Sequence, residues 1–292
     1  MRAKENPKFP KPGSSDIVQL WKRDAKGRYA NIASNFAIAE PPGLLSGGIL
    51  ADDMGLGKTL QMISLIMDGK HNAPTLVVAP VTVMSNWAQQ IQRHVHPDKA
   101  PSVLIYHGSN KLPGKLNGYR VVITSYGKLS SEHKGGAKKP LMATNWRRVI
   151  LDEGHTIRNA ATEMAASACA LKAQSRWVVT GTPMYALPLA SHSLVLLTTS
   201  SVNNIKDLHS MVKFLRITGG LEQIELFNAV ITRPLALGQQ RAELLLQNLM
   251  QDLCLRRRKD MKFVDLNIPP KTEYIHRITF RPDEKSKYDA LL

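Results

Sequence analysis

The 292-residue sequence has few cysteines, no long apolar run and fewer acidic than basic residues. Its two cysteines, Cys169 and Cys254, lie far apart, which argues against a disulfide framework or a zinc site and favours a reducing compartment. No stretch approaches the roughly 18 apolar residues that a membrane span needs. Residues 1–16 lack the apolar segment of a signal peptide. We therefore expect a protein without a membrane partner.

The charge balance favours a polyanionic partner. The chain has 39 Lys and Arg against 23 Asp and Glu, which gives a formal net charge of +16. An excess of this size in a globular protein is typical of nucleic-acid binding, and a solvated basic surface is the alternative.

A Gly-rich turn follows a short apolar strand in GGILADDMGLGKT, residues 47–59. Such a turn directs backbone N–H groups at phosphates, while Lys58 reaches the β- and γ-phosphates and the Thr59 hydroxyl binds Mg²⁺. Asp52 stands where the strict phosphate-loop pattern has its first glycine, so an ordinary Gly-rich turn is the alternative. The predicted nucleotide-binding residues are Asp53, Met54, Gly55, Leu56, Gly57, Lys58 and Thr59.

Paired carboxylates follow a second apolar strand in LDEGHTIRN, residues 151–159. Asp152 can complete the metal shell together with Thr59, while Glu153 orients or deprotonates the attacking water. A phosphate loop alone predicts nucleotide binding, but the two motifs together predict hydrolysis. The predicted cofactors are therefore ATP and Mg²⁺.

The two motifs resemble those of the Swi/Snf-type DNA-dependent ATPases of helicase superfamily two. That family writes its first motif as D-x-G-x-G-K-T, so the acidic residue is expected. The DEGH form is found in the subgroup of the helicase-like transcription factor and the fungal post-replication repair translocases. Residues 76–91, 121–129 and 177–183 resemble motifs Ia, Ib and III of the family, and residues 252–261 and 267–292 resemble the segments that follow its first lobe.

The resemblance implies roles for further residues. His155, the last residue of DEGH, joins the catalytic set of Lys58, Asp152 and Glu153 by coupling the lobes or contacting motif III, and a buried core histidine is the alternative. The DNA-contacting residues are Thr124, Ser125 and Tyr126, which follow a strand where hydroxyls commonly meet phosphates. The residues that link nucleotide state to DNA contact are Thr180, Gly181 and Thr182.

The strand candidates are short, Val/Ile-rich and continuous rather than alternating, as in parallel strands buried on both faces. They are residues 48–51, 76–79, 103–106, 121–124, 149–151 and 177–180. Helix-like stretches lie between them, at residues 58–67, 85–94 and 161–172. This alternation predicts an α/β fold: a doubly wound, mostly parallel RecA-like sheet with helices on both faces and a C-terminal helical subdomain.

We expect four segments along the chain. Residues 1–16 form a basic, poorly ordered N-terminus, residues 17–202 a RecA-like ATP-binding lobe, residues 203–262 its helical extension, and residues 263–292 the lead into a second RecA-like lobe. Within the first lobe, residues 130–140 (SSEHKGGAKKP) are expected to form a flexible basic loop.

Three further residues or segments have two possible readings each. Trp87 and Trp146 are expected to be core aromatics rather than base-stacking platforms. The basic run at residues 256–259 is either a helix-end basic face or a contact to DNA or phosphate.

Residues 185–201 interrupt the family pattern after motif III. They carry no Asp, Glu, Lys or Arg, and their deletion restores the family spacing. We interpret them as an intron translated in frame. A helical or interaction insert is the alternative.

The sequence thus predicts the first lobe of a nuclear ATPase stimulated by double-stranded DNA, acting in chromatin remodelling or DNA repair with nucleosomes among its candidate partners. A nucleotide- and DNA-binding fragment without turnover is the alternative. A P-loop kinase is less consistent with motifs Ia, Ib and III. The subgroup's ubiquitin-ligase activity has no support, because the sequence has no RING-type Cys/His cluster.

Overall fold

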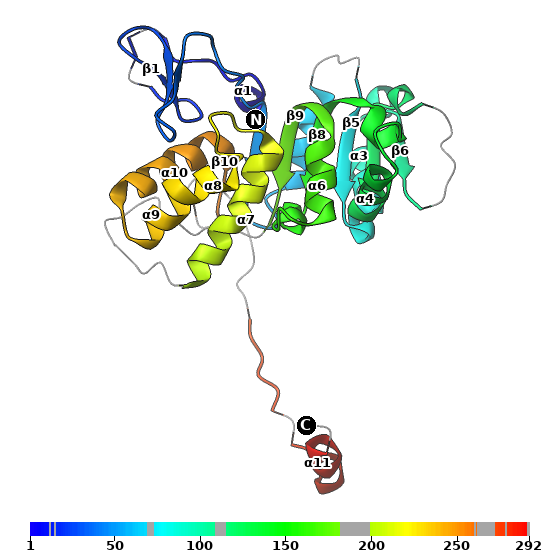
Figure 1. Cartoon of the computed structure of the whole chain (residues 1–292). Helices are drawn as coiled ribbons and strands as arrows, with labels where there is room; N and C mark the ends of the chain where they lie inside the picture. Colours follow the sequence, from blue (N-terminus) through cyan, green and yellow to red (C-terminus); the bar gives the residue numbers. More distant parts are fainter. Residues whose placement is uncertain are drawn as a thin grey trace. The chain divides into compact units, whose positions relative to one another are not determined.

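The computed structural model describes residues 1–11, 13–14, 16–68, 73–108, 115–181, 199–259, 261, 272–277 and 279–290. It divides into two compact units, Met1–Arg258 and Lys259–Leu292 (Figure 1). The second unit contains one described helix, α11 (Pro282–Asp289). Every other helix and strand described below belongs to the first unit.

A seven-stranded parallel sheet is the centre of the first unit. Its strand order is β10-β4-β9-β8-β5-β7-β6, and every described pairing is parallel. The strands are β4 (Gly47–Leu50), β5 (Thr75–Ala79), β6 (Val103–Tyr106), β7 (Val121–Ser125), β8 (Asn145–Asp152), β9 (Lys172–Val179) and β10 (Cys254–Leu255). Because they are parallel, their carboxyl ends meet along one edge, where ligands bind in open α/β sheets.

Helices cover both faces of this sheet (Figure 1). Alternate strand residues enter different cores: Val77 packs with α2 (Lys58–Met67) and α3 (Val81–His94), whereas Leu76 and Val78 belong to the opposite core. That second core includes residues of α4 (Tyr126–Lys134), α5 (Pro140–Ala143) and α6 (Glu163–Ala170). The predicted doubly wound α/β fold is therefore confirmed.

A helical extension continues the second core. It consists of α7 (Thr199–Leu215), α8 (Ile224–Phe227), the π-helical turn η4 (Asn228–Thr232), α9 (Arg233–Ala236) and α10 (Gln240–Leu253). The expected boundary at residues 202–203 falls inside α7. Of the predicted insertion 185–201, residues 199–201 begin that helix and the others lie outside the described residues. In the described part of the chain, no helix is both long and apolar enough to cross a membrane.

A small antiparallel sheet was not predicted from the sequence. It consists of β1 (Trp21–Arg23), β2 (Tyr29–Asn31) and β3 (Ala37–Ile38), with β2 in the middle. Strands of two or three residues are too short to show an alternating pattern.

The expected disorder at residues 1–16 is corrected for the first residues of the chain. Arg2–Glu5 form a helical turn, α1, and Glu5 is buried. The Glu5 carboxylate accepts hydrogen bonds from Arg148 Nε at 2.5 Å and Nη2 at 2.7 Å, and from Trp177 Nε1 at 2.9 Å. A long-range ion pair therefore orders a segment that is polar and Pro-rich in sequence.

The expected flexible loop at residues 130–140 is also corrected. Helix α4 continues to Lys134, turn residues follow, and helix α5 begins at Pro140. The cause is Glu132, which is buried and accepts hydrogen bonds from Tyr106 Oη at 2.5 Å and from the Leu141 backbone N–H at 2.8 Å. Burial and this carboxylate together raise the pKa of Tyr106.

Candidate nucleotide and DNA site

The predicted motifs follow the carboxyl ends of neighbouring strands. The phosphate loop follows β4, the Thr180–Gly181 turn follows β9, and the DEGH residues, Asp152 to His155, begin at the end of β8. These three strands are adjacent in the order β4-β9-β8, with Leu50 beside Val179 and Val179 beside Asp152. Motifs Ia and Ib follow β5 and β7, the next two strands along the same edge.

The phosphate loop ends where α2 begins. Gly57, the residue before the helix, has φ of 72°, in the left-handed region that glycine adopts most easily. The Lys58 ammonium then turns back over the loop and donates to the carbonyl oxygens of Asp52 at 2.8 Å and Asp53 at 3.3 Å. These carbonyls hold the lysine at the loop, where phosphate oxygens would compete for it.

Motif III lies against this lysine. A Cβ atom built on Gly181 would be 3.1 Å from Met54 Cγ and 3.6 Å from Lys58 Nζ, so glycine leaves room for both side chains. Thr180 is buried and its backbone N–H donates to the Leu50 carbonyl at 3.1 Å. Two of the three predicted coupling residues therefore lie at the phosphate loop, while Thr182 lies outside the described residues.

The DEGH turn has strained and crowded backbone. Glu153 has φ of 49°, which is uncommon for a residue other than glycine. A Cβ atom on Gly154 would lie 2.2 Å from Val178 Cγ1, so only glycine fits there. His155 Nδ1 lies 3.3 Å from a Glu153 carboxylate oxygen, and both side chains are partly exposed. The alternative of a buried core histidine is thus wrong for His155.

Asp152 is held by residues of the helices that follow β5 and β7. Trp87 of α3 donates from Nε1 to the carboxylate at 2.6 Å, and the Tyr126 hydroxyl of α4 donates to the Asp152 backbone carbonyl at 2.8 Å. Trp87 is a core aromatic as expected, at 1% exposure. Its role as a hydrogen-bond donor to the acidic motif was missed because sequence spacing gives no sign of it.

The electrostatics of Asp152 are compatible with a divalent cation. Burial raises the pKa of Asp152, and the charge of neighbouring Glu153 adds to this, against the Trp87 hydrogen bond and the charge of Lys58. A cation at this carboxylate would offset both the burial and the like charge. No cluster of three or more metal-binding side chains occurs among the described residues, and Mg²⁺ typically uses one or two carboxylates plus substrate phosphates. The oxygens of Thr59 and Asp152 fit that pattern.

The predicted DNA-contacting side chains are directed into the protein. Thr124 donates from Oγ1 to the Tyr106 carbonyl at 2.8 Å, and Ser125 Oγ lies 2.9 Å from His107 Nδ1 and caps α4. The Tyr126 hydroxyl is used by Asp152, and all three side chains are buried. The strand-end position is as expected, but the direction of the hydroxyl groups is not.

The basic run at residues 256–259 contributes to the phosphate loop. Arg257 donates from Nε to Asp52 Oδ2 at 3.0 Å, and Arg256 donates to the Ala51 carbonyl and the Asp53 carboxylate at 3.3 and 3.4 Å. Neither reading of this run from the sequence included a contact with the loop's own aspartates.

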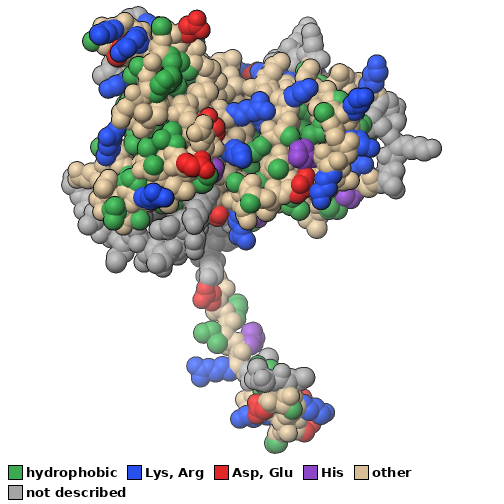
Figure 2. Space-filling model, viewed as in Figure 1, with side chains coloured by type: hydrophobic (Ala, Val, Ile, Leu, Met, Phe, Trp, Pro, Cys, Tyr) green, Lys and Arg blue, Asp and Glu red, His purple; other side chains and the backbone are tan. Residues whose placement is uncertain are grey.

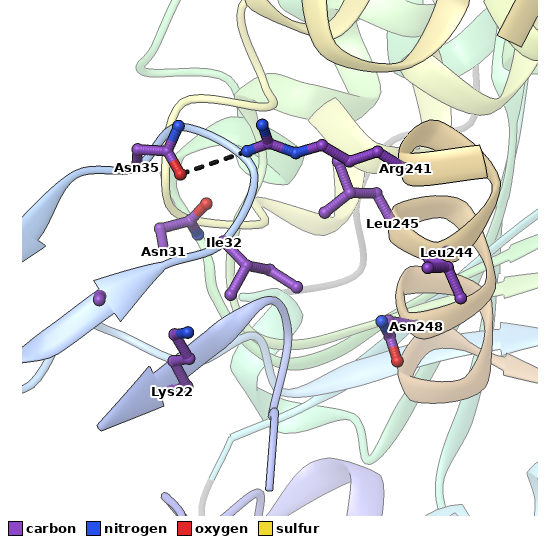
Figure 3. Close-up of a pocket in the computed structure, with 9 residues that line it drawn as sticks. Lys22, Asn31, Ile32, Asn35, Arg241, Leu244, Leu245 and Asn248 are labelled. Atoms are coloured by element: carbon purple, nitrogen blue, oxygen red, sulfur yellow. Dashed lines mark hydrogen bonds between the residues drawn. The ribbon is translucent and has the colours of Figure 1, made fainter. Parts of the chain in front are cut away.

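A separate pocket lies away from these motifs, between the small antiparallel sheet and α10 (Figure 3). Its volume is about 450 Å³ and it is lined by Lys22, Ala30, Asn31, Ile32, Asn35, Arg241, Leu244, Leu245 and Asn248. Arg241 donates across it to Asn35 at 3.3 Å (Figure 3). None of the predicted nucleotide or DNA residues lines this pocket.

Comparison with known proteins identifies the family. The model of the SNF2-related domain matches residues 20–292. The chain belongs to the SNF2-related family. The DNA repair protein rad8 of Schizosaccharomyces pombe is 33% identical to it over 84% of this chain and 23% of its own length. A putative SWI/SNF-related regulator of chromatin from Arabidopsis thaliana is 30% identical over 95% of this chain and 35% of its own length.

A solved SNF2 structure supports the same assignment. The Sulfolobus solfataricus SWI2/SNF2 ATPase core in complex with double-stranded DNA has 27% identity and a TM-score of 0.61, over 84% of this chain and 47% of its own. This SNF2-related chain is thus an SNF2-family ATPase domain homologous to DNA-repair and chromatin proteins. It spans 23–35% of the length of these two curated relatives.

Proposed function

We propose that this chain is the ATP-binding lobe of a nuclear translocase driven by ATP and stimulated by double-stranded DNA, acting in DNA repair or chromatin remodelling. The observation that carries the proposal is the order of motifs along one sheet edge. The phosphate loop follows β4, the coupling turn follows β9, and the metal and water residues lie at the end of β8. Trp87 and Tyr126 join Asp152 to the helices that follow β5 and β7.

Each residue predicted to bind the nucleotide, the metal or the attacking water has a defined task in this proposal. Lys58 leaves the Asp52 and Asp53 carbonyls and binds the β- and γ-phosphates, while the loop from Asp53 to Gly57 presents its N–H groups. Thr59 and Asp152 hold Mg²⁺, which when bound neutralises charge on the phosphates. Glu153 orients the attacking water and accepts its proton.

The coupling residues lie between the nucleotide and the second lobe. Gly181 lies against Lys58, so a change in the position of the phosphates is transmitted to motif III. His155 lies beside Glu153 and is exposed enough to contact a partner surface. We assign both to the coupling of nucleotide state to a second RecA-like lobe in the full-length protein.

The DNA contact is revised from the side chains of Thr124, Ser125 and Tyr126 to the start of α4. The first N–H groups of a helix have no partner within the helix and attract phosphates. Gly127, in that first turn, is exposed. The Lys128 N–H already donates to Ser125 Oγ at 3.2 Å, and the Lys128 ammonium donates to the Gly108 carbonyl at 3.0 Å, so the Tyr126 and Gly127 N–H groups are the candidates for a phosphate. Lys and Arg side chains are spread across the face seen in Figure 2 and form no single patch there.

A second candidate is a nucleotide- and DNA-binding fragment without turnover of its own. The chain covers 47% of the solved SWI2/SNF2 core, and the resemblance to helicase superfamily two implies that a second lobe supplies an arginine to the transferred phosphate. Such an arginine contributes roughly 10³- to 10⁵-fold in related enzymes.

ATPase assays with and without duplex DNA separate the two candidates. We expect the isolated chain to bind ATP·Mg²⁺ and to hydrolyse it near background, and a two-lobe protein to be stimulated by DNA. In the two-lobe protein, Glu153→Gln should abolish turnover and keep ATP binding, whereas Lys58→Ala should lose both. DNA affinity should fall with salt by about 0.9 in log–log slope for each neutralised phosphate. If the ATPase rate of the two-lobe protein is the same with and without duplex DNA, the proposal of a DNA-stimulated translocase is refuted.

A further inference from the structure

The phosphate loop is held by a segment about two hundred residues later in the chain. β10 pairs with β4 in parallel, with Cys254 beside Ile49 and Leu255 beside Leu50. The pairing continues beyond the strands, because the Ala51 N–H donates to the Leu255 carbonyl at 2.8 Å and the Asp53 N–H to the Arg257 carbonyl at 3.0 Å. Residues 255–257 therefore run alongside the first half of the loop.

Arg257 and Asp52 form the centre of this contact. The Asp52 side chain is fully buried, and its Oδ1 accepts from the Arg257 backbone N–H at 2.9 Å. Its Oδ2 accepts from Arg257 Nε at 3.0 Å and also from Nη2. Burial opposes the charge, yet the hydrogen bonds from Arg257 and Gln61 hold the pKa of Asp52 below its usual value.

Gln61 of α2 completes the arrangement. Its Nε2 donates to Asp52 Oδ2 at 3.1 Å and to the Leu56 carbonyl at 2.9 Å, and its Oε1 accepts from Arg257 Nη2 at 2.5 Å. One side chain thus joins the start of the loop, the end of the loop and the arginine. Asp52, which departs from the strict glycine pattern, is part of this arrangement and does not face a phosphate.

We propose that Arg257 is a positioning residue for the nucleotide, because it keeps the buried Asp52 carboxylate occupied and so leaves Lys58 available to the phosphates. Lys58 already donates to the Asp52 backbone carbonyl, so it is the cation at hand for an Asp52 carboxylate that has lost its arginine. An unpaired buried carboxylate is costly, which favours pairing with a cation within reach. The inference rests on the proposed nucleotide site.

The proposal predicts the direction of a double substitution. Arg257→Gln should weaken binding of a fluorescent ATP analogue by roughly tenfold or more. Adding Asp52→Asn removes the carboxylate that competes for Lys58, so the double variant should bind the analogue more tightly than Arg257→Gln alone. Arg257→Lys, which keeps the charge but loses the two-point contact, should give an intermediate loss. Arg233→Gln, an exposed site in α9, is the control for the lost positive charge.

Hydrogen exchange of the nucleotide-free protein tests whether Arg257 holds the phosphate loop when no nucleotide is bound. We expect Arg257→Gln to speed exchange at the amides of Ala51 and Asp53, while the amides of β8 stay protected. Wild-type exchange and affinity in Arg257→Gln would overturn the proposal, as would a double variant that binds more weakly than either single one. If Arg257→Gln does not fold, the same test compares the ATP-analogue affinity of Arg257→Lys with that of the double variant Arg257→Lys, Asp52→Asn. A wild-type chain that binds no nucleotide, yet shows the exchange effect, refutes the proposed function and with it the role of Arg257 in nucleotide binding.

Discussion

Two arginine–carboxylate pairs tie distant parts of the chain to the central sheet, and their surroundings differ. Glu5 and Arg148 are both buried, with side chains 4% and 1% exposed. In the other pair the carboxylate of Asp52 is fully buried, but Arg257 is 45% exposed. Both members of the first pair are enclosed, with Arg147 as a further arginine 3.7 Å from Glu5, whereas the second pair has one partner at the surface.

The neighbours of each pair explain why only one of them is connected to the site. Trp177 donates a hydrogen bond to the Glu5 carboxylate. The hydroxyl of Ser46, just before β4, donates to the Glu5 backbone carbonyl at 2.9 Å. These residues lie near the start of β4, away from the phosphate loop. Asp52 is inside the loop, and its partner is one residue from the end of the first unit. The same kind of ion pair therefore has two roles: Glu5 and Arg148 stabilise the fold, and we assign Asp52 and Arg257 to the positioning of the nucleotide site.

The largest effect that separates the two pairs is on stability. Glu5→Ala leaves Arg148 buried without its carboxylate, and we expect it to lower the free energy of unfolding by about 3–5 kcal/mol. Nucleotide affinity of the folded fraction should not change. Urea denaturation and titration with an ATP analogue measure the two quantities, and Glu40→Ala, at an exposed site, is the control. A loss of affinity with little loss of stability would remove the distinction between the pairs.

Acid should reduce the difference between wild type and Glu5→Gln. Burial opposes ionisation, but the hydrogen bonds and charge of Arg148 hold the pKa of Glu5 below its ordinary value of 4.5. A carboxyl with a lowered pKa in the fold contributes stability that is complete above the ordinary value and is lost as the pH falls through the lowered one. Urea midpoints from pH 7 to 3 should therefore converge for the two proteins below about 4.5. A gap that stays constant to pH 3 would contradict this.

The sequence predicts the sheet and the nucleotide motifs because both depend on local patterns. Continuous Val/Ile runs give the positions of most strands, and the glycines before Lys58 give the start of α2. The position of the phosphate and acidic motifs at one sheet edge also follows, because parallel strands bring their carboxyl ends together. Gly57 has a positive φ, and Gly154 has no room for a Cβ beside Val178. Both glycines already belong to the predicted motifs.

What the sequence does not predict are the contacts between distant segments. Glu5 is 143 residues from Arg148, and Asp52 is 205 residues from Arg257, so no spacing rule connects them. The direction of the Thr124 hydroxyl depends on β6, because it bonds to the Tyr106 carbonyl of that neighbouring strand. Such contacts are set by packing, which periodicity does not describe.

A carboxylate with a neutral donor gives the smallest expected effect and sharpens the comparison with the two arginine–carboxylate pairs. Trp87→Phe keeps an aromatic ring in the core but removes the N–H that Asp152 Oδ2 accepts. Hydrogen bonds to charged groups contribute about 1.5–3 kcal/mol, and solvent or Mg²⁺ can partly replace this one. We expect the Mg²⁺ concentration needed for nucleotide binding to rise roughly tenfold, the factor that about 1.4 kcal/mol represents, with binding in the absence of Mg²⁺ unchanged.

Trp146→Phe is the matched control for this substitution. Trp146 is as buried as Trp87, and its Nε1 donates to the Leu141 carbonyl at 3.0 Å. Both variants should lose a similar amount of stability, because each removes one buried donor from a core tryptophan. Only Trp87→Phe should change the Mg²⁺ requirement, because Trp87 contacts the proposed metal ligand Asp152, whereas Trp146 contacts Leu141, which is not among the proposed nucleotide or metal residues. Equal Mg²⁺ requirements in the two variants would mean that Trp87 packs the core without positioning Asp152.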